Sequence, residues 1–256
     1  MIKCEKIESV LIITLNRPDK YNAFIREMAL DFQRKLDECF DDELVRSIMI
    51  TGEGDAFCAG QDLNEAINPE GLQIEDIVME HYNPIIQKIR NINKPVIAAV
   101  NGVAAGAGAN IALACDVVVA TKSAVFIQAF SKIGLIPDSG GTYFLPRLIG
   151  LQKAAGIMMT GEEITASKAE SLGMIYAVYD DSEFKQESIK LALSISSMPT
   201  KALGYIKKLL SKTFKNSLEE QLNLEAEMQA LAASTEDHQI GIDAFLKKCP
   251  PAFKGK

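Results

Sequence analysis

Short apolar runs alternate with helical segments through the first half of the chain, and this alternation limits the possible folds most strongly. The predicted strands lie at 10–15, 45–51, 95–100, 117–120 and 125–127. The predicted helices lie at 25–40, 74–92 and 106–115. Strands that alternate with helices favour parallel pairing, so the sequence predicts an α/β core.

The second half of the chain reads as helical, with recognisable helix starts. Thr165 is suited to cap a short helix that ends near Gly173. Ser217 to Glu220 form a capping box that opens a helix over 218–233. Thr235, followed by two acidic residues, begins a last helix that reaches Lys248.

Domain organisation follows from this change of pattern. No linker, repeat or low-complexity segment separates the two halves of the 256-residue chain, which is long enough to bury one large core. We therefore predict an α/β core over 1–195 and a helical region over 196–256 that packs on a neighbouring subunit.

Charge and cysteine usage exclude several classes of protein. The net charge of −7 argues against a nucleic-acid-binding surface. Five scattered cysteines without a CxxC pair fit a reducing cytoplasm better than a disulfide scaffold or a metal site. The charged N-terminus is unlike a signal peptide, and polar residues interrupt the apolar stretch 96–120, so a membrane span is not expected.

Two segments, 55–63 and 101–110, concentrate small residues where a ligand can approach the backbone closely. A helix that begins near Gly106 leaves its first N–H groups unpaired and its positive dipole end facing the turn. Such donors can stabilise an oxyanion on a thioester carbonyl, and losing one costs about 2.7–4 kcal/mol of barrier. The glycine spacing equally suits tight helix–strand packing, and it is not a GxGxxG dinucleotide motif.

Four segments in order resemble motifs of the crotonase superfamily, which contains enoyl-CoA hydratases and isomerases. These segments are 16–23, 57–63, 94–102 and 241–246. The resemblance covers nearly the whole chain. It implies a spiral of ββα units with a C-terminal helical trimerisation region, and a homotrimer or hexamer. It also implies an acyl-CoA thioester substrate with no separate cofactor.

The resemblance further implies which residues form the site. The oxyanion donors would be the backbone N–H groups of Gln61 and Ala107, and the adenine of coenzyme A would lie near the 23 and 59–63 positions. Lys248, from the last helix of a neighbouring subunit, would contact the phosphates. The implied substrate-binding set is Ala23, Ala59, Gln61, Asp62, Leu63, Asn64, Ala107, Phe130 and Lys248.

The pattern of a hydratase is broken at two positions. Enoyl-CoA hydratases use two glutamates to position and split water, and the resemblance places these at Asn110 and Phe130. An amide cannot act as a base at neutral pH, and a phenyl ring carries no proton to transfer. Ordinary hydration is therefore not expected.

A different carboxylate, Asp138, stands at a position where some family members carry an acid that faces the acyl pocket. Burial would raise its pKa and make it a competent base. The residues alone allow a second interpretation, because Asp-Ser-Gly-Gly also suits an N-cap for the helix that follows.

Segments 102–109 and 129–138 most resemble one branch of the family, the ring-1,2-epoxyphenylacetyl-CoA isomerases. Members of that branch open a ring epoxide to an oxepin and also shift double bonds, and one acid/base carboxylate is enough for such a reaction. The sequence therefore predicts an acyl-CoA isomerase of phenylacetate or fatty-acid catabolism. The alternatives are an enoyl-CoA hydratase of low activity and a non-catalytic acyl-CoA-binding protein.

Several other polar residues have competing interpretations. The segment 138–141 matches the Asp-Ser-Gly-Gly of trypsin-like proteases, but the chain has only His81 and His238 as bases and lacks the expected all-β pattern. Both histidines are interpreted as packing or surface residues. Cys58 is interpreted as a buried thiol.

Three carboxylates close to the first loop remain open. Asp62 is interpreted as a hydrogen-bond acceptor that braces the loop, although it could instead be an acid in the pocket. Glu65 and Glu80 could face the acyl chain, which the sequence does not decide.

Overall fold

The computed structural model describes residues 1–67 and 71–256, and its core contains two sheets. The six-stranded sheet has the order β1-β2-β3-β5-β7-β10 and the four-stranded sheet the order β4-β6-β8-β9. The strands of the first sheet are β1 Ile2–Ile7, β2 Val10–Leu15, β3 Ser47–Gly52, β5 Val96–Val100, β7 Val117–Thr121 and β10 Ala177–Tyr179. The strands of the second are β4 Ala56–Cys58, β6 Val103–Ala105, β8 Val125–Ile127 and β9 Glu163–Thr165.

The chain winds as a spiral between these sheets. The consecutive pairs β3–β4, β5–β6 and β7–β8 each place one strand in each sheet, and helices follow every pair. The repeated strands pair in parallel, whereas the outer pairs β1–β2 and β8–β9 are antiparallel. This arrangement is the predicted spiral of ββα units.

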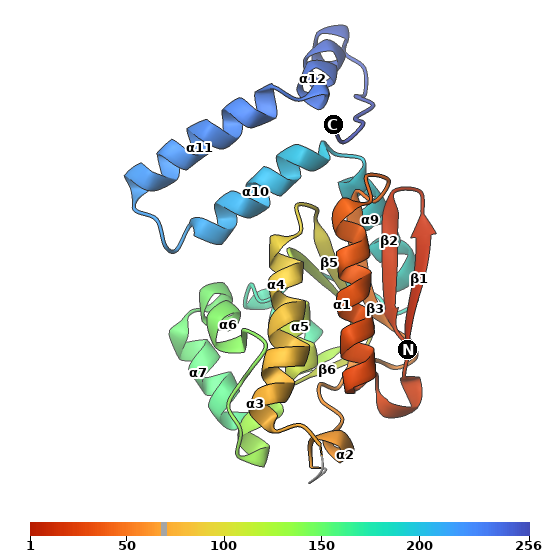
Figure 1. The fold of residues 1–256 in the computed structure, drawn as a ribbon, viewed down its shortest axis with the longest axis vertical. Helices are drawn as coiled ribbons and strands as arrows, with labels where there is room; N and C mark the ends of the chain where they lie inside the picture. The colour runs from red at the N-terminus through yellow and green to blue at the C-terminus, as the bar shows by residue number, and fades with distance from the viewer. Residues whose placement is uncertain (68–70) are drawn as a thin grey trace.

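Helices cover the sheets and extend beyond them (Figure 1). The helices of the core are α1 Arg26–Asp41, α2 Leu63–Ala66, α3 Ile74–Ile77, α4 Asn83–Asn91, α5 Ala107–Leu113, α6 Gly141–Ile149, α7 Leu151–Thr160, α8 Ala166–Ser171 and α9 Phe184–Ser196. Three helices follow them, α10 Thr200–Lys212, α11 Leu218–Ala233 and α12 Glu236–Lys247. Short 3-10 segments lie at Pro18–Lys20 and Ala129–Ile133, and a π-helical turn at Val78–Tyr82.

The central strands are mostly apolar because both faces of the larger sheet are buried. Ile13 and Ile48 point into the main core, which α1 and α4 line side by side. Val10, Met49 and Ile97 point to the opposite face, where α9 covers them. Alternating residues of one strand therefore enter two different cores, which explains the near-continuous apolar runs.

Most predicted elements are present, with one correction. The predicted helix over 74–92 is built from α3, the π-helical turn and α4. The segment between the predicted strand 95–100 and the predicted helix 106–115 contains the strand β6, Val103–Ala105, which was not predicted. Three residues are enough to form a strand there because β6 pairs with β4 on one side and with β8 on the other.

The C-terminal helices have the predicted caps. The hydroxyls of Thr165 and Thr235 accept from the N–H groups of Lys168 and His238, and Ser217 forms a complete capping box with Glu220. Within the described chain, no helix combines the length and apolar character needed to cross a bilayer.

The helices α10–α12 project from the core at one end of the molecule (Figure 1). Lys207 anchors α10, since its buried ammonium contacts Asp116 at 2.7 Å and donates to the carbonyl of Ile89 at 2.7 Å. Large apolar side chains remain exposed on these helices, among them Leu210, Leu218, Leu222, Phe245 and Leu246.

Candidate active site

The two small-residue segments meet at one edge of the smaller sheet. β4 leads into residues 59–62 and β6 into residues 106–107, and since the two strands are parallel neighbours, their carboxyl ends face the same edge. A Cβ built on Gly60 would lie 3.3 Å from the Ala107 nitrogen and 3.1 Å from the Ala105 oxygen. Gly60, which precedes Gln61, is therefore packed against the turn before α5.

Glycine is required at two positions of this edge. Gly106, the N-cap of α5, has φ 53° and ψ −127°, which side chains rarely tolerate. A Cβ on Gly108 would lie 2.2 Å from the Cys58 carbonyl oxygen. Tight helix–strand packing is therefore present at Gly108, and it brings the first N–H of α5 to the loop after β4.

The backbone N–H groups of Gln61 and Ala107 are free to donate to a ligand atom. Phe24 bridges residues 60 and 62, donating to the Gly60 oxygen at 2.7 Å and accepting from Asp62 N–H at 2.8 Å. In such a parallel bridge the N–H of Gln61 points away from Phe24. Within the described residues, neither this N–H nor that of Ala107 has a protein acceptor.

The Gln61 side chain is fixed by two partners. Its Oε1 accepts from the Tyr82 hydroxyl at 2.8 Å, and its Nε2 donates to Glu65 Oε2 at 2.7 Å. Burial raises the pKa of Tyr82 well above its ordinary value, so the phenol stays a donor. Glu65 also accepts from the backbone N–H of Arg26, at 3.0 Å.

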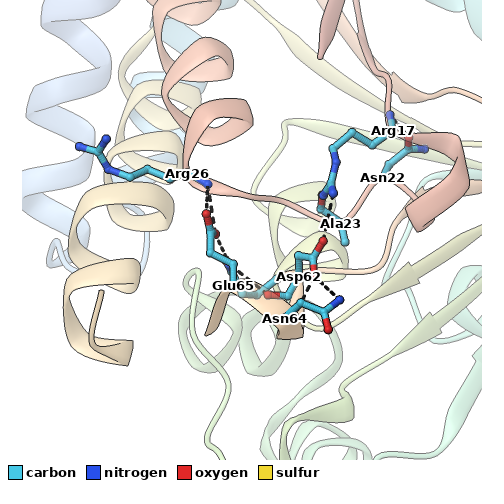
Figure 2. A network of polar contacts seen from close by, with 8 residues as sticks. Arg17, Asn22, Ala23, Arg26, Asp62, Asn64 and Glu65 are labelled. Carbon is cyan, nitrogen blue, oxygen red and sulfur yellow. Dashed lines mark hydrogen bonds and ion pairs between the residues drawn. The ribbon is translucent and has the colours of Figure 1, made fainter. Parts of the chain in front are cut away.

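Asp62 braces the loop, as the sequence predicted. Figure 2 shows the Arg17 guanidinium between Ala23 and Asp62, donating to the carbonyl of the first and to Oδ2 of the second at 3.0 Å. Asp62 Oδ1 caps α2 by accepting from Asn64 N–H at 3.1 Å. Burial raises the pKa of Asp62, but the hydrogen bonds from Arg17 and Asn64 outweigh it, and the net pKa lies below its ordinary value.

The other predicted coenzyme A-binding residues divide into two groups. Ala23, Ala59, Leu63 and Asn64 lie on the two segments that Phe24 joins, and the Leu63 side chain is 54% exposed. Lys248 is the C-cap that directly follows α12, and α12 lies at the opposite end of the long axis from α2 (Figure 1). One chain therefore does not bring Lys248 to the others.

Asp138 lies on the loop before α6 and does not cap that helix. The N-cap is Gly140, and it makes no side-chain capping bond, so the capping interpretation is wrong. The half-buried carboxyl of Asp138 instead accepts from the Ser139 hydroxyl at 2.8 Å. Burial raises the pKa of Asp138 above its ordinary value, and the bond from Ser139 offsets part of that rise.

The two positions where the resemblance places the hydratase glutamates carry no base. Asn110 is fully buried and donates from Nδ2 to the Asp138 carbonyl oxygen at 2.9 Å. The Phe130 ring edge lies 3.7 Å from a Cβ built on Gly106, beside the turn that presents Ala107. Among the described residues that adjoin the Asn110 side chain, Asp138 carries a carboxyl group, and burial raises the pKa of that group.

The sequence did not single out Tyr82 or Gln128, which support Gln61 and Asn110, and it noted Ser139, which supports Asp138, only within the protease-like segment 138–141. Their partners are distant in the chain or carry no motif, so a single sequence offers no signal for them. The one available hint is that Ser139 adjoins the predicted acid.

The remaining candidates have structural surroundings. Burial raises the pKa of Cys58 to about 12, so its thiol stays protonated. Glu80 pairs with the Arg26 guanidinium at 2.7 Å. His81 is fully buried, which lowers its pKa, and His238 is exposed. A cavity of about 690 Å³ lies between α4, α6 and α10, away from Gln61 and Ala107.

Comparison with known proteins gives a consistent picture. A family model described as enoyl-CoA hydratase/isomerase matches residues 5–256. The chain is 43% identical over 253 residues to 1,2-epoxyphenylacetyl-CoA isomerase of Escherichia coli (strain K12), covering 97% of this chain and 96% of that one. It is 41% identical over 255 residues to a protein of Rhodobacter capsulatus named probable enoyl-CoA hydratase, covering 100% and 98%.

Solved structures agree in fold. The crystal structure of an enoyl-CoA hydratase from Polaromonas sp. JS666 matches with a TM-score of 0.92 at 34% identity, covering 98% of this chain and 99% of that chain. An enoyl-CoA hydratase from Bacillus anthracis matches with a TM-score of 0.92 at 31% identity, covering 100% and 99%.

Proposed function

Because the chain belongs to the enoyl-CoA hydratase/isomerase family, we propose that it is an acyl-CoA isomerase. Gln61 and Ala107 hold the thioester oxygen, and Asp138 moves a proton between two carbons of the acyl group. The proposed substrate class is a strained ring epoxide or a β,γ-double bond of a CoA thioester, as in phenylacetate or fatty-acid catabolism. One observation carries the proposal: the site offers a half-buried carboxylate of raised pKa where neither hydratase glutamate is present.

One base is enough for the proposed double-bond shift, because the proton that it removes from one carbon is returned to another. The ionised Asp138 carboxylate takes a proton from the acidic α-carbon, and the electron pair moves onto the thioester oxygen as an enolate. The two N–H groups stabilise that charge, and removing one such donor typically costs about 2.7–4 kcal/mol. The protonated Asp138 then returns its proton to the γ-carbon. Proton transfer of this kind requires neither a metal nor a redox cofactor.

The proposed binding mode involves a neighbouring subunit. The adenine of coenzyme A lies beside Ala23 and the 59–64 segment, and Lys248 of another copy reaches the phosphates, because Lys248 of the same chain lies at the far end. The exposed apolar side chains of α10–α12 fit a role in joining copies of the chain. We propose a homotrimer or hexamer, with 1–195 as the acyl-CoA-binding core and 196–256 as the helical region.

A panel of thioesters tests the proposed reaction. We expect 3-hexenoyl-CoA or the ring epoxide of phenylacetyl-CoA to isomerise without incorporating oxygen from H₂¹⁸O, as measured by mass spectrometry. We expect crotonyl-CoA to gain water slowly or not at all, since the site lacks the two hydratase glutamates. Hydration of crotonyl-CoA faster than any isomerisation would favour the second candidate, an enoyl-CoA hydratase, which the name of the Rhodobacter capsulatus relative supports. Binding without turnover of any thioester would favour a non-catalytic acyl-CoA-binding protein.

The pH profile gives a second test. Because Asp138 acts as a base in its ionised form, kcat/KM should fall on acidification through a single ionisation displaced above the ordinary aspartate value of 3.8. Ser139→Ala removes the hydrogen bond that lowers this pKa, so the acid limb should move to higher pH. An acid limb that stays in place in Ser139→Ala would contradict the assignment of that limb to Asp138.

A further inference from the structure

Two buried amide side chains form a relay that ends on the backbone of Asp138. Gln128 Nε2 donates to Asn110 Oδ1 at 2.7 Å, and Asn110 Nδ2 donates to the Asp138 carbonyl oxygen at 2.9 Å. The relay spans three elements, because Asn110 lies in α5, Gln128 follows β8, and Asp138 precedes α6. Asn110 and Gln128 are 0% and 1% exposed.

The loop that receives this relay has a demanding backbone. Ser139 and Gly140 are consecutive residues with positive φ, 51° and 75°, and the Ser139 position is costly for a residue with a side chain. The Asp138 carbonyl also accepts from Gly141 N–H at 2.8 Å. A Cβ on Gly141 would lie 2.4 Å from Asn110 Nδ2, so glycine there permits the close approach of the amide.

The polarity of the relay is fixed from one end. Because the carbonyl oxygen of Asp138 can only accept, the Asn110 NH₂ group must face it, which turns the Asn110 oxygen toward the NH₂ group of Gln128. Gln128 Oε1 has no hydrogen-bond partner among the described residues. Gln128 therefore donates to Asn110 while its own oxygen stays buried without a partner, which costs stability.

From these contacts we propose that Asn110 is a positioning residue for Asp138, held in turn by Gln128. This inference rests on the proposed function, because it concerns how the proposed base is held. Asn110 touches the backbone of Asp138 and not the reacting atoms. A carboxylate at position 110 offers acceptors alone and would face the carbonyl oxygen with like charge. The asparagine that removes the hydratase base therefore also supplies the donor that the Asp138 loop uses.

Three variants interrupt the relay in different ways. Asn110→Ala removes both bonds, Asn110→Asp keeps the size and the acceptor but loses the donor, and Gln128→Met removes the orienting donor at similar length. Each should lower kcat for the isomerised thioester by about 10- to 100-fold, because a misplacement near 1 Å can cost that much. KM and the Kd for a non-reactive acyl-CoA should stay within about twofold. Asn110→Asp should also move the acid limb of the pH profile upward, since a nearby carboxylate disfavours ionisation of Asp138.

The matched control is another asparagine–glutamine pair outside the site. Asn216 Nδ2 donates to Gln221 Oε1 at 3.0 Å between α10 and α11. Asn216→Ala should leave kcat within about twofold. If Asn110→Ala does not fold, as judged by its melting temperature, Asn110→Asp and Gln128→Met still test the relay.

Combining these variants with Asp138→Asn separates positioning from general support. Once the carboxylate is absent, Asn110→Ala should cause no further fall in kcat, because both residues act on one step. The inference is overturned by unchanged kcat in all folded relay variants, or by an equal further loss in the Asp138→Asn background. Unchanged turnover in Asp138→Asn itself would instead refute the proposed mechanism, and the positioning role would fall with it.

Discussion

Asp138→Asn should lower turnover of the isomerised thioester by about 10²- to 10⁴-fold, which is the usual contribution of a general acid/base. The amide has no proton-accepting oxygen of useful basicity, so proton transfer loses its carrier. Its oxygen can still accept from Ser139, as Oδ1 does at 2.8 Å, so the local geometry is kept. Steady-state rates with the substrate identified from the thioester panel give the measurement, and the Kd for a non-reactive acyl-CoA should not change.

The same variant should be more stable than the parent protein at neutral pH. Burial raises the folded-state pKa of Asp138 above its unfolded value, so the folded state binds more protons between the two values. Stability therefore falls as pH rises through that window and stays lower above it. Removing the charge removes this cost, and the melting temperature of Asp138→Asn should exceed that of the parent at pH 7 and match it more closely near pH 3. A variant with full turnover would refute the catalytic role, whatever its stability.

Gly108→Ala should damage both stability and activity. The added Cβ would lie 2.2 Å from the Cys58 carbonyl oxygen, and since that atom is backbone, α5 and β4 must move apart. Overpacking of this kind typically costs about 1–3 kcal/mol of stability. The same shift displaces Ala107 N–H from Gln61 N–H, so kcat/KM should fall by about 10²- to 10³-fold, as when an oxyanion donor is lost. Urea denaturation and steady-state kinetics measure the two effects.

Gly156→Ala provides the matched control for that substitution. Gly156 lies in α7, and no heavy atom lies within 4 Å of a Cβ built there. An alanine in an exposed helix should add about 0.5–1 kcal/mol of stability and leave the kinetics unchanged. Parent-like kcat/KM in Gly108→Ala would show that the contact between α5 and β4 does not set the position of the oxyanion donors.

The four central strands of the larger sheet could be predicted from the sequence, whereas β1, β10 and most of the smaller sheet could not. β2, β3, β5 and β7 are strands of five or six mostly apolar residues whose side chains alternate between two cores, so they stand out in the sequence. β4 and β6 have three residues each and are rich in alanine, a composition that equally suits a turn. Their strand character comes from neighbours that are distant in sequence.

The site was predictable to the extent that local motifs describe it. The segments that carry Gln61 and Ala107 could be located because glycine and alanine cluster there. The role of Asn110 could not, because its two partners lie 18 and 28 residues further along the chain. The choice between cap and acid at Asp138 likewise depended on where α6 begins, and helix ends are poorly fixed by sequence.

Successive ββα units, the coils of the spiral, supply different residues of the proposed site. The first supplies Gln61, the second supplies Ala107 and Asn110, and the third supplies Gln128 and Asp138. Polarisation of the thioester thus draws on the first two coils, while the choice of proton carrier belongs to the second and third. In this proposal, substitutions on the third coil can change which carbon is protonated without moving the two donors that hold the carbonyl oxygen. The spacing between successive ββα units, rather than the shape of any single loop, therefore sets how the residues of the proposed site lie relative to one another.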